Sequence, residues 1–104
     1  MSYEFSIKRN DTSPAIKRDL IADGLETIAG ASVRFYMGEI VAAPATILSV
    51  APPIVAYEWE PSDTAKAGRF KAEFEVVYAD GAKETFPNDR YITVIVTPDL
   101  GEPE

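Results

Sequence analysis

Hydrophobic and polar residues alternate with a period of two along much of the chain. The clearest stretch runs from residue 70 to 78, where Lys71, Glu73 and Glu75 occupy one set of positions and apolar residues occupy the other. Successive side chains of a β-strand point to opposite faces, so this pattern predicts a strand with one buried face. Asp80 and Gly81 follow and are typical of a tight hairpin turn, which predicts a return strand over residues 83–86.

The same alternation predicts strands on both sides of this hairpin. Apolar positions two residues apart mark strands near residues 5–7, 16–20, 33–37, 45–50, 54–59 and 91–97, with glycine, proline and asparagine between them. Residues 25–29 and 62–67 fit at most a helical turn. Seven or eight short strands separated by frequent turns are typical of an all-β, antiparallel β-sandwich of roughly 100 residues. We therefore predict one sandwich over residues 1–97 and an acidic, proline-containing tail over residues 98–104.

Composition limits the chemistry available to this sandwich. The 104 residues include no histidine and no cysteine. Disulfides, thiolate nucleophiles and cysteine-based zinc sites are thereby excluded, together with the usual general base near neutral pH. The glycines match no phosphate-binding spacing. We expect a protein that is not an enzyme and that binds no cofactor and no metal.

The formal net charge is −7, and eleven of the 17 acidic residues follow residue 57. An acidic surface without a basic stripe disfavours nucleic acid and anionic membrane surfaces as partners. Residues 40–57 carry no charge and are long enough to raise the possibility of a membrane span, but Pro44, Pro52 and Pro53 would break such a helix. The N-terminus lacks the basic and apolar regions of a secretory signal. We expect no membrane partner.

The charge-free segment, residues 40–57, has two interpretations. It forms either two strands with one buried face, or strands that also contact a neighbouring subunit, because interface centres are depleted in charge. The candidate interface residues are Ile40, Val41, Ile47, Leu48, Val50 and Ile54.

Trp59 and Tyr57 suggest an aromatic platform for sugar, and hence a carbohydrate-binding sandwich as the alternative function. Alternation, however, places both rings on the buried face of their strand, where they are expected to form core. Tyr36 and Tyr91 are better candidates for exposed rings.

Two groups of carboxylates suggest further chemistry. Glu58 and Glu60 lie on the opposite strand face, about 7 Å apart, a spacing that suits a glycosidase pair. Together with Asp63, Asp80 and Asp89 they also offer oxygen ligands for Ca²⁺, but no dense calcium-loop pattern is present. We expect a solvated strand face and turn residues instead.

A set of short motifs resembles a family of tailed-bacteriophage virion proteins, that of the N-terminal domain of the baseplate upper protein. The motifs occupy residues 11–14, 30–35, 57–59, 63–64, 68–76, 80–81, 85–89 and 92–94. The resemblance implies an immunoglobulin-like sandwich in the virion that is assembled in the host cytoplasm. It further implies docking onto capsid, neck or tail proteins, in multiple copies or as a homo-oligomer. Full-length relatives continue into a linker and another domain, so head decoration, neck and baseplate positions all remain open.

Overall fold

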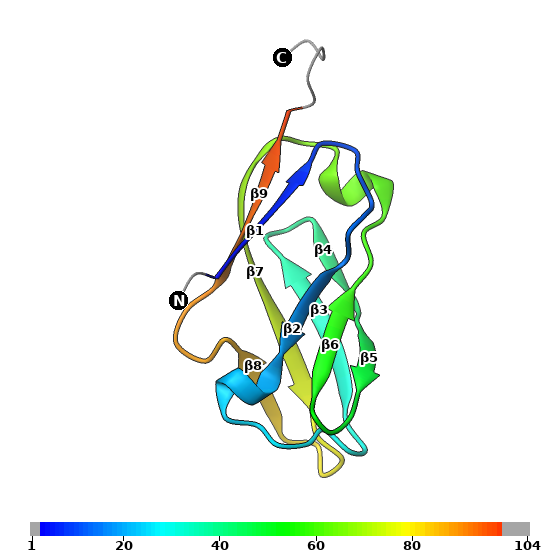
Figure 1. The fold of residues 1–104 in the computed structure, drawn as a ribbon, viewed down its shortest axis with the longest axis vertical. Coiled ribbons are helices and arrows are strands. Elements are labelled where there is room, and N and C mark those ends of the chain that lie inside the picture. The colour runs from blue at the N-terminus through cyan, green and yellow to red at the C-terminus, as the bar shows by residue number, and fades with distance from the viewer. Residues whose placement is uncertain (1–2, 99–104) are drawn as a thin grey trace.

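The computed structural model describes residues 3–98, which form nine strands and two short 3-10 helices in two facing sheets (Figure 1). The helices are η1 (Leu20–Asp23) and η2 (Pro61–Thr64). The strands are β1 (Glu4–Lys8), β2 (Ile16–Asp19), β3 (Ser32–Met37), β4 (Val41–Pro44), β5 (Thr46–Ser49), β6 (Ile54–Tyr57), β7 (Gly68–Val77), β8 (Lys83–Phe86) and β9 (Ile92–Thr97).

The larger sheet has the order β1-β9-β7-β3-β4, with β8 also paired to β7, and the smaller sheet has the order β2-β6-β5. Two sheets built from strands alone pack face to face (Figure 1), so the predicted all-β sandwich is confirmed. One feature of the prediction is wrong: β1 pairs with β9 in parallel, from Glu4 opposite Thr93 to Lys8 opposite Thr97. No hairpin joins these two strands, because the chain crosses to the smaller sheet after β1, and their direction is therefore not fixed as antiparallel.

The core follows the alternation seen in the sequence. On β7, Ala72, Phe74 and Val76 are buried, and the apolar positions of β3 and β9 are buried in the same way. The Phe35 ring of β3 stacks on the Tyr57 ring of β6 with 4.7 Å between ring centres. Aromatic rings thus join the two sheets at the centre of the sandwich.

The chain changes sheets within the charge-free segment. β4 ends at Pro44 as the edge strand of the larger sheet, and β5 begins at Thr46 as the edge strand of the smaller one. The sequence prediction of a single strand over residues 45–50 is therefore incomplete, because it omits β4. Four small or apolar residues ending in proline gave no alternation by which to recognise that strand.

Two short 3-10 helices form in the described chain. Of the two segments that fit at most a helical turn, residues 62–67 overlap η2, whereas residues 25–29 contain no helix. Instead, η1 follows β2, because the Asp19 side chain accepts a hydrogen bond from the Ile21 N–H (2.9 Å) and Gly24 supplies a φ of 91° at the C-terminal end. Of the tail predicted over residues 98–104, residues 99–104 lie outside the described part of the chain. Within the described residues, no helix has the length and apolar character needed to cross a membrane.

Stability measurements on two neighbouring residues of β7 test the strand orientation. Phe74→Ala should lower the free energy of unfolding by about 3–5 kcal/mol, because it empties a fully buried site. Glu73→Ala should cost less than about 0.5 kcal/mol, because its side chain lies on the opposite face. Urea unfolding followed by circular dichroism measures both values, and equal losses would contradict this orientation.

Candidate functional site

The aromatic pair proposed from the sequence as a sugar platform is buried. Tyr57 is 6% exposed and Trp59 is 4% exposed, and both rings contact Phe35. The expectation that these residues form core is confirmed, and the two rings cannot serve as a surface platform. The indole Nε1 of Trp59 has no hydrogen-bond acceptor among the described residues.

The Tyr57 hydroxyl is tied to the turn that follows β6. It donates a hydrogen bond to Oδ2 of the buried Asp63 carboxylate (2.5 Å), and the backbone N–H of Glu60 donates to the same oxygen (2.9 Å). Burial, and then the Asp63 carboxylate, raise the pKa of Tyr57 far above its ordinary value. These contacts make Asp63 a structural residue that fixes the start of η2.

The other carboxylates singled out from the sequence fall in three places: Glu58 and Glu60 line one open hollow of about 470 Å³ beside Pro44 and Thr46, whereas Asp80 and Asp89 lie in two separate turns. Glu58 and Glu60 are exposed and lie beyond the end of β6, outside the strand predicted to carry them. Asp80 accepts a hydrogen bond from the Ala82 N–H in the β7–β8 turn (2.9 Å), and Asp89 pairs with Arg90 (3.5 Å). Within residues 3–98, no three acidic side chains gather in a way that could hold a metal ion.

The six predicted interface residues differ in exposure and in position. Val41 is 4% exposed and belongs to the core, because its position on β4 points it inward. Ile40 is exposed but precedes β4, so both β4 and β5 lie between it and Val50 along the chain. Ile47 packs against the core.

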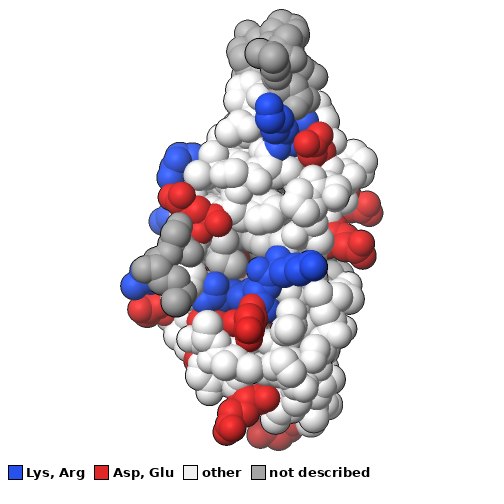
Figure 2. All heavy atoms as spheres, viewed as in Figure 1, with Lys and Arg blue, Asp and Glu red and all other residues white. Residues whose placement is uncertain are grey.

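The remaining candidates form what we call the β5 patch: Leu48, Val50 and Ile54, around the β5–β6 turn. Leu48 is 50% exposed, Val50 is 43% exposed and Ile54 is partly exposed. In Figure 2 the surface over β5 and the adjoining part of β6 is largely free of charged side chains.

A hollow that the sequence did not reveal lies on the outer face of the larger sheet. On one edge of β7, β9 pairs with residues as far as Ala72 and β8 pairs with residues from Phe74 onward. Glu73 therefore faces a gap in the hydrogen-bonded ladder, where the loop of residues 87–91 leaves the sheet. The loop and β7 border an open hollow of about 320 Å³, lined by Glu73, Thr85, Pro87, Asn88, Asp89, Arg90 and Tyr91.

A second hollow of about 220 Å³ adjoins the first and shares Glu73 and Tyr91 with it; Tyr36, Gly38 and Lys71 complete its lining. Tyr91 is 51% exposed and Tyr36 is partly exposed, so both rings are more accessible than Tyr57 and Trp59, as the sequence indicated. We call these two adjoining depressions the tyrosine hollow. Alternation identified both rings, but their proximity depends on sheet register, which the sequence pattern does not provide.

Comparison of the chain with protein-family models, with curated proteins and with solved structures found no match. The resemblance to phage virion proteins therefore stays a prediction from the sequence motifs.

Two buried or hydrogen-bonded tyrosines predict how stability depends on alkaline pH. Burial and the Glu84 carboxylate raise the pKa of Tyr78 to about 12, and the pKa of Tyr57 is raised further. Because both folded-state values exceed the unfolded value, stability should be fully present below about pH 10 and decline above it. Urea unfolding between about pH 8 and pH 11.5 measures the decline. The double variant Tyr57→Phe/Tyr78→Phe should flatten it, and an unchanged slope in that variant would contradict the assignment.

Proposed function

We propose that this protein is a non-enzymatic structural component of a bacteriophage particle that docks onto other virion proteins and is present in multiple copies. The observation that carries the docking part is the β5 patch at an uncharged edge of the sandwich. Its place in a phage particle rests on the order and spacing of the sequence motifs, and head, neck and baseplate are all compatible with it.

The edges of the two sheets support docking on this side of the molecule. β4 and β5 are edge strands, and both belong to the charge-free segment. Natural sheets commonly protect such edges with charges or proline, because unpaired backbone groups invite another strand. β4 has Pro44 at its end, whereas β5 contains neither proline nor charge. β5 is therefore the less protected edge.

A bulge increases the exposure of this edge. Ile47 pairs with Val55 and Ser49 pairs with the adjacent Ile54, so Leu48 is an extra residue in β5. Bulges redirect side chains, and the Leu48 side chain is half exposed. An exposed leucine beside Val50 supplies apolar contact area, while the absence of charge lowers the cost of removing the surface from water.

The overall charge favours the same side for association. Copies that each carry −7 repel one another, and the repulsion is weakest where their charge-poor surfaces meet. Contact through the β5 patch would leave the acidic residues of the second half of the chain facing solvent or a basic partner.

Self-association tests the β5 patch. We expect multimers in sedimentation velocity at about 100 µM, and monomers for Leu48→Lys/Val50→Lys, because two buried, unpaired charges would destabilise the contact. Ile21→Lys is the matched control, since Ile21 is 52% exposed on η1, and it should leave association unchanged. Urea unfolding should stay within about 1 kcal/mol of the parent for both variants. Multimers that persist in the double variant would exclude the β5 patch as the contact.

Particle composition tests the phage assignment. Mass spectrometry of gradient-purified particles of the encoding phage should detect the chain in a fixed ratio to the major capsid or tail protein. Particles that carry the Leu48→Lys/Val50→Lys variant should contain much less of it than particles with the Ile21→Lys control. Absence of the parent chain from purified particles would overturn the virion proposal.

A further inference from the structure

The tyrosine hollow combines aromatic and polar groups on a rigid part of the fold. Tyr36 lies near the C-terminal end of β3 and Glu73 in the middle of β7, and the two residues are direct cross-strand partners. Lys71 lies on the same face of β7, with its Nζ 5.1 Å from the centre of the Tyr91 ring. Side chains carried by paired strands in a sheet centre are held in place more firmly than side chains on free loops.

The loop that completes the hollow is anchored at several points. The Asn88 amide donates hydrogen bonds to Glu84 Oε2 (3.1 Å) and to the Thr85 carbonyl oxygen (3.0 Å). The Arg90 guanidinium lies over the Tyr3 ring, 4.9 Å from its centre, and packs the loop against the chain before β1. These contacts reduce the ordering that a ligand would impose on the loop.

The charges around the hollow balance. Lys71 and Arg90 are offset by Glu73 and Asp89, although the whole chain carries −7. The two acidic side chains would repel a phosphate or carboxylate ligand. A neutral ligand rich in hydroxyl groups suits both the positive and the negative side chains, because hydroxyls accept hydrogen bonds from ammonium and guanidinium groups and donate hydrogen bonds to carboxylates.

The aromatic rings add a second requirement. Tyrosine has an apolar ring and a polar hydroxyl, and Tyr91 exposes about half of its surface. A pyranose ring presents an apolar C–H face that packs on such a ring while its hydroxyls remain free for hydrogen bonds. The two depressions, of about 320 Å³ and 220 Å³, are open and small, which suits a short stretch of a chain and not an enclosed ligand.

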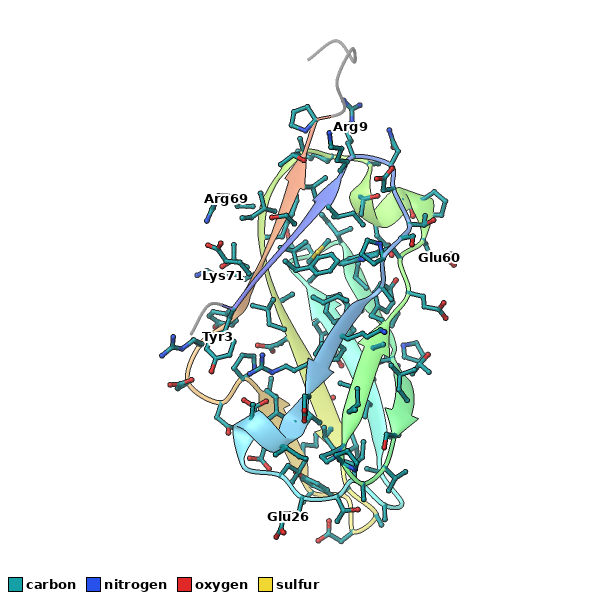
Figure 3. The ribbon with its side chains drawn as sticks, viewed as in Figure 1. Tyr3, Arg9, Glu26, Glu60, Arg69 and Lys71 are labelled. Atoms are coloured by element: carbon teal, nitrogen blue, oxygen red, sulfur yellow. The ribbon has the colours of Figure 1, made fainter. Side chains whose placement is uncertain are left out.

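We propose that the tyrosine hollow is a binding site for a short segment of a neutral oligosaccharide, with Tyr36 and Tyr91 packing on sugar rings and Lys71 and Glu73 bonding to hydroxyls. The site is distinct from the β5 patch. Figure 3 shows Lys71 at the left of the molecule, pointing outward, whereas β5 lies at the right in the same view (Figure 1). A glycan-binding surface therefore goes beyond the proposed docking role.

The test is a titration of the full chain with cellohexaose, maltohexaose, chitohexaose and mannohexaose, followed by amide NMR. At least one hexaose should bind with a dissociation constant of about 10 mM or tighter and shift amides at residues 36–38, 71–73 and 85–91. Tyr91→Ala should weaken that binding by about tenfold, because it removes the stacking surface, whereas Tyr91→Phe should retain most of it. Glu73→Gln should weaken it without affecting the fold.

Leu48→Ala is the control, because Leu48 is equally exposed but lies in the β5 patch, and it should bind the hexaose as the parent does. Binding by none of the four hexaoses would overturn the proposal, as would shifts centred on β2, β5 or β6. An equal loss of binding in Leu48→Ala and Tyr91→Ala would also contradict it. These outcomes are independent of particle association, so the oligosaccharide site and the virion role can fail separately.

Discussion

The packing of Phe35 against Tyr57 is the contact on which the sandwich depends. The chain has no cysteine, so no disulfide can hold the two sheets together. Phe35 is fully buried on β3 of the larger sheet, and its ring contacts Tyr57, the last residue of β6, at 4.7 Å and Trp59, in the segment after β6, at 5.7 Å between ring centres. Such ring pairs contribute about 0.5–1.5 kcal/mol each beyond the burial of their area. Phe74 of β7 extends the cluster beneath Phe35.

This contact also sets the geometry of one end of the molecule. With the Tyr57 ring fixed, its hydroxyl reaches Asp63 and holds η2, which leads into β7. Thr64, fully buried beside Asp63, donates a hydrogen bond from its hydroxyl to the Asp11 carbonyl oxygen (2.8 Å). The buried polar groups therefore link the turn after β1 to the turn after β6. This network explains why acidic and hydroxyl residues near the core carry structural roles and are not free to act as ligands.

The sequence predicted the parts of the fold that depend on local alternation. The hairpin strand at Lys83–Phe86 was placed correctly. The buried faces of β3, β7 and β9 were identified because a half-buried strand shows apolar residues at every second position of the sequence. β4 was missed because its residues do not alternate, and the parallel pairing of β1 with β9 was missed because it joins the two ends of the described chain. The tyrosine hollow could not be predicted for the same reason: it depends on the register that pairs Tyr36 of β3 with Glu73 of β7, and on the loop that brings Tyr91 beside them.

Both candidate surfaces lie where a strand ladder is interrupted. At Leu48 an extra residue enters β5 and turns an apolar side chain toward solvent; at Glu73 the partner strand divides into β8 and β9, and the intervening loop opens a polar hollow. Where the strands pair regularly, every second side chain points inward and forms the core. The outward side chains between them are of mixed type and do not form a cluster of similar groups. Where pairing is irregular, side chains are redirected and need not pack in the core. Bulges and interruptions are for this reason common at binding sites. A chain without histidine or cysteine still offers shape, aromatic rings, hydrogen bonds and charged side chains for recognition, and both proposed surfaces lie at these two interruptions.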